Sequence, residues 1–172
     1  MWGRAMTVAA VEELARAFDT DFARPIEVRA AAVEDLLAIG IAGDLYALAR
    51  RELAGLFSDK AVTALPGAAP GLLGISGFRG ALVPVYDLQV LLGGAAGSAP
   101  PRWLATAAAA PVALAFDRFD ALLRVPREAI AARPAGAAGH ASRVVRVGGE
   151  IRPVLDVPSI LGAIRALVRR QP

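Results

Sequence analysis

The sequence predicts a mainly β protein built from small barrels. Its 172 residues, with 56% hydrophobic content, are enough for one domain or for two small domains packed closely together. About nine short apolar runs follow one another at close spacing with turn residues between them, which is typical of small barrels. The segment Pro-Val-x-Asp also occurs twice, at residues 84–87 and 153–156, each time at the end of an apolar run. That repetition favours two similar subdomains.

Residues 1–32 are predicted to form an N-terminal helix and a linker. Apolar side chains recur at helical spacing over residues 7–18, with Glu12 and Glu13 on the opposite side. Pro25 interrupts the segment that follows. This helix either covers part of the protein's own core, which is the more common role of an amphipathic helix, or docks to a partner.

From Val33 the apolar pattern changes to a period of two, which is typical of half-buried strands. Gly43-Asp44 lies between two such runs and predicts a hairpin turn. Residues 51–56 are expected to form a single helical turn, and residues 61–65 a short strand.

The stretch 65–93 organises the chain. Glycines fall at every third position from 71 to 80, and glycines in strands allow a bulge or the close approach of another backbone. Arg79-Gly80 is predicted to be the tip of a tight connection between two strands. Asp87 then suits the N-cap of a short helix that a glycine pair ends.

The second half of the chain is predicted to contain short strands, two loops and a final helix. In order, we expect a loop at 94–101, strands at 103–109 and 112–116, a turn at 117–120, a strand at 121–125, a helical turn at 126–130, a loop at 133–139, a hairpin of 142–147 and 150–155, and a helix at 158–170. Arginines near the end of that helix complement its dipole.

No set of residues has the pattern of a catalytic or cofactor site. The glycines at 71–80 are followed by no Gly-Lys-Ser/Thr and lack the strand–glycine–helix context of a nucleotide-binding site, so bulge or packing glycines are the better interpretation. The aspartates occur where turns and caps favour them, and the single histidine, His140, lies in a Gly/Ala loop. The absence of cysteine excludes thiolate metal sites and cysteine nucleophiles. We therefore expect no enzyme activity, no cofactor and no metal site.

Composition also argues against nucleic acid and membrane as partners. The net charge is +3, but the arginines are scattered and do not form the clustered footprint of a nucleic-acid-binding protein. The longest apolar run, 104–116, is broken by Pro111 and is too short to span a bilayer. Acidic residues interrupt the N-terminal segment before a signal-peptide core could form. We expect a soluble cytoplasmic protein.

Arg79 is the strongest candidate for a site residue. An arginine on a rigid turn among apolar residues is typical of the centre of a protein interface, where the planar guanidinium is enriched. An arginine that pairs with Asp87 or simply faces water is equally compatible with the sequence. The candidate partner-binding site consists of Arg79 and its neighbours Phe78, Ile75, Gly80 and Leu82.

The same stretch resembles the signature of CheW-type chemotaxis coupling proteins, a family of adaptors. In that signature a proline-rich turn leads to G-x-x-N-L-R-G, then to an apolar strand that ends V-P-[VI]-x-D-L, and then to a short helix. Here the two parts read Gly74-Ile75-Ser76-Gly77-Phe78-Arg79-Gly80 and Val83-Pro84-Val85-Tyr86-Asp87-Leu88. The resemblance covers residues 33–161, which implies a CheW-like domain between an N-terminal segment, 1–32, and the end of the last helix with its tail, 162–172.

The resemblance implies both a fold and a function. Members of the family are similar in consisting of two small, SH3-like five-stranded β-barrels packed together with a groove between them. They are non-enzymatic adaptors that link the cytoplasmic tips of methyl-accepting chemoreceptors to a CheA-type histidine kinase. The regulatory domain of that kinase shares the fold and packs barrel to barrel with the adaptor. The arginine of the family motif matches Arg79 and is associated with receptor-tip binding in the inter-barrel region.

Two departures from the family pattern bear on partner choice. The usual Asn-Leu before the arginine is Gly77-Phe78 here, which removes an amide from the turn and enlarges its apolar side chain. The acidic residue of the family's V-x-E-[IV] run matches Gly55 here, which removes a polar contact on the receptor-facing side. The alternatives are a divergent scaffold that binds only one of the two partners and a small-ligand-binding β-barrel enzyme that uses the glycine stretch.

Overall fold

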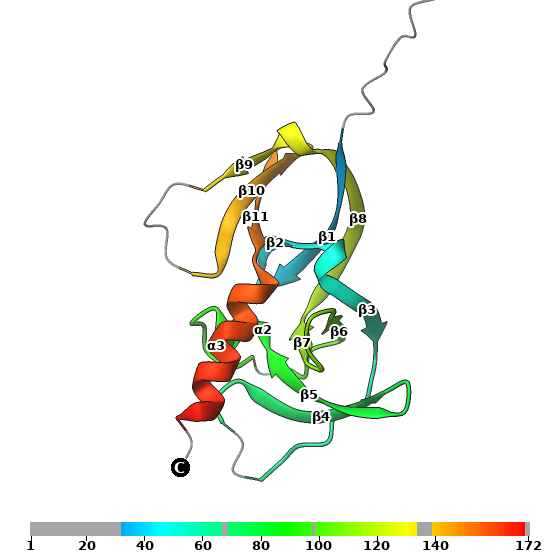
Figure 1. Ribbon diagram of the computed structural model, residues 1–172, viewed down its shortest axis with the longest axis vertical. Helices are drawn as coiled ribbons and strands as arrows, with labels where there is room; N and C mark the ends of the chain where they lie inside the picture. Colours follow the sequence, from blue (N-terminus) through cyan, green and yellow to red (C-terminus); the bar gives the residue numbers. More distant parts are fainter. Residues whose placement is uncertain (1–31, 67–68, 98, 134–138, 171–172) are drawn as a thin grey trace, which may run out of the picture. The chain divides into compact units, whose positions relative to one another are not determined.

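The computed structural model describes residues 32–170, apart from 67–68, 98 and 134–138 (Figure 1). They belong to one compact unit, Ala32–Pro172. The predicted N-terminal helix lies outside the described residues.

The described part of the chain is mainly β, as predicted, and its eleven strands form two sheets (Figure 1). Sheet A has the strand order β8-β1-β2-β11-β10-β9, and sheet B has the order β3-β6-β7-β5-β4. The strands of sheet A are β1 (Val33–Ile41), β2 (Asp44–Ala49), β8 (Arg118–Pro126), β9 (Ile130–Ala132), β10 (Ala141–Val147) and β11 (Glu150–Leu155). Those of sheet B are β3 (Leu53–Ser58), β4 (Leu72–Phe78), β5 (Ala81–Asp87), β6 (Trp103–Ala107) and β7 (Ala113–Phe116).

Two α-helices accompany the sheets between residues 32 and 170, the range that the structure describes with its gaps. The short helix α2 (Leu88–Leu91) follows β5, and α3 (Val157–Arg169) is the predicted C-terminal helix. Neither this helix nor any other in the described part of the chain has the length and apolar character needed to cross a membrane.

The chain passes from sheet A to sheet B and back. A 3₁₀ turn, Arg50–Glu52, leads from the β1–β2 hairpin into β3 of sheet B. After β7 the chain returns at Asp117 to build the other strands of sheet A. The two parts of sheet A join where β2 and β11 pair in parallel, with Ala47 opposite Val154. The first hairpin therefore needs the end of the chain to complete its sheet.

Each sheet contains a hairpin with the same sequence motif and the same kind of pairing, while the division into two similar subdomains stays a prediction. In each, a hairpin ends in Pro-Val-x-Asp and its second strand pairs in parallel with a distant strand, β5 with β7 and β11 with β2. Each motif aspartate then caps the helix that follows. Asp87 accepts a hydrogen bond from the amide of Gln89 at 2.8 Å, and Asp156 accepts one from the amide of Ser159 at 3.0 Å.

Each of the two sheets is curled, and in each a short segment of the chain links the two edge strands. In sheet A the edge strands β8 and β9 are consecutive, separated by a 3₁₀ turn, Arg127–Ala129. In sheet B the segment after the edge strand β3 brings Thr63 beside Ile75 of the opposite edge, with backbone hydrogen bonds of 2.8 and 2.9 Å. Such curling is what barrel closure requires. The five-stranded SH3-like form of each barrel stays a prediction, because sheet A has six strands.

Three apolar clusters make up the core. One face of sheet A carries Leu36, Ala47, Ala49, Val125, Val145 and Val154. One face of sheet B carries Phe78, Val83, Val85, Leu104, Ala113 and Ala115. The largest cluster lies on the opposite faces of the same strands and includes Leu37, Leu48, Leu114 and Leu155. Ile160 and Ile164 of α3 pack against them. Because successive strand residues point to opposite faces, the central strands are buried on both.

Ion pairs span the curve of sheet A. Glu34, only 7% exposed, accepts hydrogen bonds from Arg143 at 3.0 and 3.1 Å and a further one from Arg51. Arg152 donates to Asp120 at 2.9 Å and also pairs with Glu150. These contacts connect β1 with β10 and β8 with β11, strands that are not neighbours in the sheet. They therefore help to hold its curvature.

Two predictions near the first hairpin differ from the structure. The hairpin is present, but its turn is Ala42-Gly43, with φ of 51° and 89°, and Asp44 already belongs to β2. Two positive φ values in succession match the turn to the twist of the strands. The helical turn predicted at 51–56 is limited to the 3₁₀ turn, because Leu53 begins β3 and is buried in the core.

Two further local predictions need correction. The strand predicted at 61–65 is reduced to the single bridge of Thr63. The turn predicted at 117–120 is wrong, because β8 begins at Arg118, which pairs with Gly40 of β1. Asp117 instead accepts a hydrogen bond from the amide of Ala42 at 2.7 Å and so stabilises the first hairpin turn.

Candidate functional site

The β4–β5 hairpin has the predicted tight tip. Phe78 pairs with Ala81, so Arg79 and Gly80 form a two-residue turn, with φ of 48° and 84°. Glycine adopts this left-handed conformation freely, whereas a non-glycine residue there is uncommon and costs about 1 kcal/mol. The turn matches the strand twist and places the exposed Arg79 side chain at a fixed point on the surface.

The five predicted site residues do not share one face of the hairpin. The register pairs Ser76 with Val83, and Gly77 with Leu82, so alternate pairs point to opposite sides. Phe78 lies on the inner side and is only 6% exposed, whereas Leu82 lies on the outer side and is 73% exposed. The partly buried Ile75 shares the outer side with Leu82, and Arg79 and Gly80 form the tip.

An aromatic pair and a lysine support the tip from inside. Phe57 of β3 meets Phe78 edge to face, with ring centroids 4.9 Å apart. The Lys60 ammonium lies 5.8 and 5.6 Å from these two rings and donates a hydrogen bond to the carbonyl of Gly77 at 3.1 Å. Cation–π contacts of this kind contribute about 0.5–1 kcal/mol at exposed sites. Sequence reasoning missed Phe57 and Lys60, although Lys60 is the only lysine in the sequence.

Arg79 has no carboxylate partner among the described residues. The alternative in which it pairs with Asp87 is wrong, because the Asp87 carboxylate is buried and caps α2. Beneath the tip lies a cavity of about 130 Å³, lined by Arg79, Phe57, Phe78, Val83 and Pro111 among others. The guanidinium is therefore free to bind an external group.

Gly74 confirms the prediction that a strand glycine allows a close backbone approach. A Cβ at Gly74 would lie 2.1 Å from the carbonyl oxygen of Thr63, and φ is 146°. The register of the hairpin also shifts between Leu72 and Gly74. A larger residue would push away the segment that joins the two edges of sheet B.

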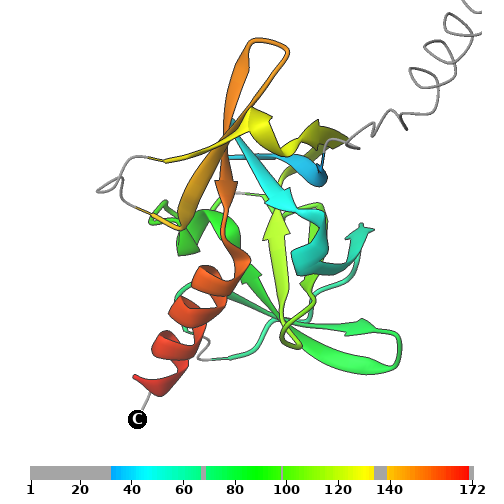
Figure 2. The same cartoon turned by 45° about the horizontal axis from the view of Figure 1, so that its top comes forward.

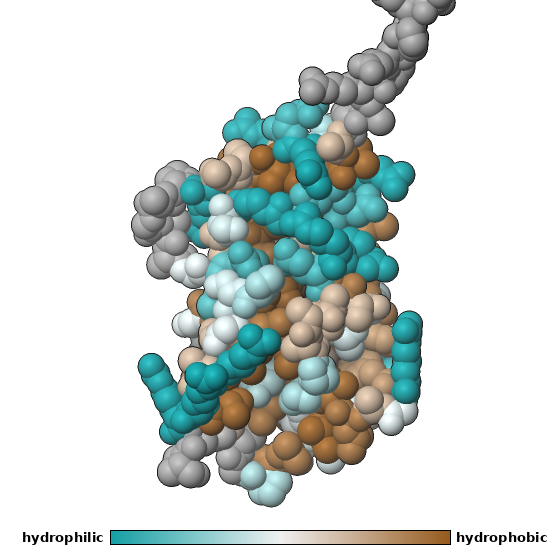
Figure 3. All heavy atoms as spheres, viewed as in Figure 1, coloured by the Kyte–Doolittle hydropathy of each residue, from teal (hydrophilic) through white to brown (hydrophobic). Residues whose placement is uncertain are grey.

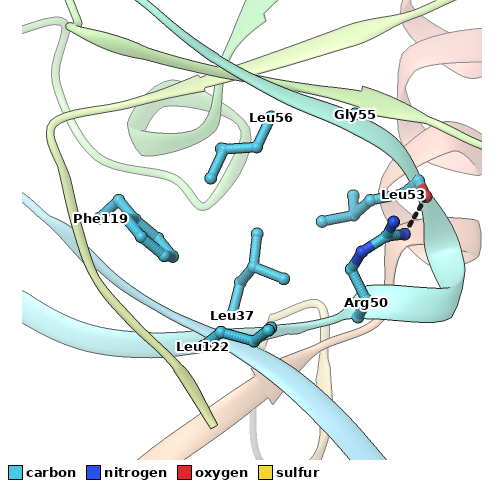
Figure 4. A pocket seen from close by; sticks show the side chains of 7 residues that line it. All are labelled: Leu37, Arg50, Leu53, Gly55, Leu56, Phe119 and Leu122. Atoms are coloured by element: carbon cyan, nitrogen blue, oxygen red, sulfur yellow. Dashed lines mark hydrogen bonds between the residues drawn. The ribbon is translucent and has the colours of Figure 1, made fainter.

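A second concave surface, the apolar cleft, lies between the two sheets, and the sequence analysis named none of the side chains that line it as site residues. Figure 4 shows its side chains converging from β1, β3 and β8 on a space of about 250 Å³. Its lining consists of Leu37, Leu53, Gly55, Leu56, Phe119 and Leu122 with one charged residue, Arg50. The Arg50 guanidinium donates a hydrogen bond to the carbonyl of Leu53 at 3.0 Å.

Gly55 lies between the apolar cleft and the Phe57 ring that supports the β4–β5 hairpin. It lines the cleft, and a Cβ at this position would lie 2.8 Å from Cε2 of Phe57. Any side chain at this position would therefore shift the ring that packs against Phe78. The position where the family pattern has an acid thus has a local steric reason to be glycine.

His140 has a neighbour that the sequence did not suggest. Its Nδ1 lies 2.9 Å from the hydroxyl of Ser159, at the start of α3. The nearby Asp156 carboxylate accepts from the Ser159 amide, so it caps the helix and does not orient the imidazole. Among the described residues there is no group of three or more His, Cys, Asp or Glu side chains arranged to hold a metal ion.

Comparison with known proteins places the chain in a family. A search of the curated proteins found no match. Among solved structures, the crystal structure of the scaffolding protein TtCheW from Thermoanaerobacter tengcongensis is similar, with a TM-score of 0.65 and 17% sequence identity, covering 73% of this chain and 90% of that chain. Residues 35–165 match the family model of the CheW-like domain. The chain therefore belongs to the CheW-like domain family.

Proposed function

We propose that the protein is a non-enzymatic chemosensory adaptor that couples chemoreceptor tips to a CheA-type histidine kinase. Family membership and a fold similar to a protein described as a scaffold support this proposal. Both partners act at the cytoplasmic side of the membrane, so we expect the adaptor in the cytoplasm. The adaptor acts only by binding, because it holds two proteins together and catalyses no reaction.

The observation that carries the proposal is the exposed Arg79, which has no carboxylate partner in the described part of the chain, at the tip of a supported hairpin. Its guanidinium has five donors in a planar fork, which suits the carboxylates and carbonyls of a protein partner. Because Lys60 and the aromatic pair hold the tip, little backbone freedom is lost when the partner binds. We assign Arg79, Gly80 and Leu82 to direct contact, and Phe78 to the support of the tip.

The apolar cleft suits a helical receptor tip. An amphipathic helix commonly lays its apolar face into a groove lined by hydrophobic side chains, and six of the seven lining residues of the cleft carry no charge. Leu122 in its wall is 59% exposed, which supports a surface that a partner covers. Arg50 at the cleft provides one charge that can pair with an acidic residue of the helix.

Titration calorimetry with each partner separately tests this proposal. The full chain is expected to bind both the receptor tip and the kinase regulatory domain. Arg79→Glu should weaken receptor binding about tenfold or more, because it places a carboxylate where a donor is needed. Arg127→Glu, an equal charge change at an exposed site in the 3₁₀ turn between β8 and β9, should leave it unchanged.

The outcomes distinguish the proposal from its alternatives. Binding to only one partner would identify a divergent scaffold, for which the glycine at position 55 in place of the family acid is the supporting observation. Binding to neither partner would overturn the adaptor function. Unchanged receptor affinity in Arg79→Glu would overturn the site assignment alone.

A further inference from the structure

The cavity beneath the β4–β5 hairpin tip leads from the surface to the core of sheet B. Phe78 and Val83 belong to that core cluster, line the cavity and are each only 6% exposed. Ala54, Arg79 and Pro111 also line it and are exposed. An apolar group that enters the cavity from solvent therefore continues the core of the sheet.

The polar groups of the cavity are limited to one cation and one hydroxyl. Among the described residues that line it, Arg79 alone carries a charge. The hydroxyl of Thr106 donates to the carbonyl of Gly55 at 3.4 Å. Arg79 forms no ion pair within the described part of the chain. The cavity thus combines an apolar wall with a single guanidinium that is available to an external anion.

Contacts within the protein fix the walls of the cavity before a partner binds. The amide of Ala107, at the end of β6, donates to the carbonyl of Val112 at 2.9 Å and closes the β6–β7 turn, and both residues line the cavity. Phe57 and Phe78, which also line it, pack edge to face. A site that is already formed loses little conformational freedom on binding, so it can discriminate between side chains by their shape.

The size of the cavity selects the kind of side chain. Its volume is about 130 Å³. An apolar cavity of about 150 Å³ in another protein accommodates a benzene molecule. The present cavity is smaller, so a branched aliphatic group fits it better than an aromatic ring with its stem.

The surface around sheet B suits a protein partner. In Figure 3, viewed as in Figure 1, hydrophobic surface gathers over sheet B, whereas hydrophilic side chains cover most of sheet A. A free carboxylate small enough to enter the cavity contacts few atoms, and the affinity available per atom is limited. A side chain of a protein partner gains in addition from the contacts that the rest of the partner makes.

We propose that the cavity is a specificity pocket for one leucine, isoleucine or valine of the receptor tip, and that Arg79 pairs with a carboxylate one helical turn away on the same helix. Side chains three or four residues apart on a helix are neighbours, about 5–6 Å apart at Cβ, so both can engage a pocket that the guanidinium itself lines. This inference rests on the proposed function, because it names the receptor side chains that the hairpin tip selects.

A nuclear magnetic resonance titration of the full chain tests the pocket without the receptor. The probe is 4-methylpentanoate, which joins the branched end of leucine to a carboxylate. The matched controls are 4-methylpentylamine, which reverses the charge, and 3-phenylpropanoate, which replaces the branched end by a ring. We expect 4-methylpentanoate to shift the amide signals of Phe78, Val83 and Ala110 saturably, and each control to bind about fivefold more weakly or less. Arg79→Gln should abolish the preference for the acid over the amine.

Two variants that fill the cavity test the same pocket with the receptor tip. Ala54→Leu and Ala110→Leu enlarge lining residues that come from different segments, and each should weaken receptor binding about tenfold. Neither alanine is buried, so the fold should persist, as circular dichroism can verify. Ala131→Leu is the matched control at an exposed position of β9 and should bind the receptor tip like the unmodified chain.

The outcomes separate this inference from the proposed function. Receptor binding by the unmodified chain, with full affinity in both filled variants, would overturn the pocket and leave the adaptor function in place. No receptor binding by the unmodified chain would overturn the adaptor function, and saturable binding of 4-methylpentanoate would then assign the cavity to a free carboxylate instead. Equal binding of the acid and the amine would overturn the selection of an anion by Arg79.

Discussion

Leu82 and Ile151 occupy the same position in the two similar hairpins. Each stands two residues before the proline of its Pro-Val-x-Asp segment, one in β5 and one in β11. Each is largely exposed, at 73% and 55% respectively. Figure 2 shows both hairpins, green and orange, projecting from the body of the unit. Exposed apolar side chains at equivalent positions of the two hairpins suit a protein that binds a similar partner surface at each hairpin.

Glutamate at Leu82 or at Ile151 should weaken binding to at least one of the two partners, the receptor tip or the kinase regulatory domain, about tenfold. The reason is that a carboxylate buried in an apolar contact loses its hydration. The free energy of unfolding should change little, because both side chains face solvent. Calorimetry on Leu82→Glu and Ile151→Glu measures this, with Val168→Glu on α3 as an exposed aliphatic control. Full affinity in both hairpin variants would exclude these faces as the docking surface.

Removal of the Lys60 side chain should loosen the hairpin tip. Lys60→Ala loses the cation–π contacts and the hydrogen bond to Gly77, so we expect a stability loss of about 1 kcal/mol and weaker receptor binding. Lys60→Arg keeps both interactions and should restore most of the loss. Chemical denaturation and receptor titration measure the two effects. Equal stability and affinity in Lys60→Ala would contradict a supporting role.

A side chain at Gly55 should disturb both the apolar cleft and the hairpin. Gly55→Ala forces the Phe57 ring to move, so we expect a destabilisation of about 1–3 kcal/mol. Gly77→Ala is the matched control, because a Cβ at Gly77 has no neighbour within 4 Å. Thermal unfolding compares the two variants. If Gly55→Ala is as stable as the control, the ring can relax and the steric reason for glycine is lost.

Local sequence chemistry predicted the hairpins and the helix caps. The aspartates at 87 and 156 cap their helices, and the glycine pair at 148–149 forms a turn with positive φ, because a few adjacent residues determine such features. Arg79-Gly80 was placed at a tip for the same reason. These elements could be predicted without knowledge of the distant chain.

Features that depend on distant residues were missed. β3 looked helical because its pairing with β6 and the burial of Leu53 depend on residues that are distant in the sequence. The apolar cleft draws on three strands from two sheets, so no local pattern reveals it. Phe78 was expected among the contact residues, but it lies on the inner side of the hairpin because the register of β4 and β5 decides which face it takes.

Glu52 should make the protein more stable as the pH falls through its folded pKa. Burial raises the pKa of Glu52 above 4.5, and this outweighs the hydrogen bond from the Val157 amide and the charge of Arg51. Between 4.5 and the raised value the folded carboxyl binds more protons than the unfolded one, so stability falls as pH rises through that window.

Glu52→Gln should remove this pH dependence and still accept from Val157. We expect its stability to match that of the unmodified chain to within about 1 kcal/mol at neutral pH, whereas Glu52→Ala, which has no acceptor, should lose about 1–2 kcal/mol. Urea unfolding at pH values from 4 to 7 compares the three proteins. A glutamine variant with an unaltered pH profile would show that Glu52 does not titrate in this range.

Asp120 should have the opposite effect on stability in acid. Burial would raise its pKa, but hydrogen bonds from Arg118 and Arg152 outweigh burial and lower the pKa below 3.8. Its contribution is therefore fully present above pH 3.8 and is lost as the pH falls through the depressed folded value.

The variant Arg152→Met should show how much the ionised Asp120 contributes to the free energy of unfolding. The methionine keeps much of the packing of the Arg152 stem but leaves Asp120 with only the exposed Arg118 as a partner, so we expect a loss of about 1–3 kcal/mol at neutral pH. The difference from the unmodified chain should shrink below pH 3.8, because protonation of Asp120 removes from the unmodified chain the ion pair that the variant already lacks. Urea unfolding at neutral and acid pH measures the difference, and a constant gap would mean that Arg152 acts through packing and not through its charge.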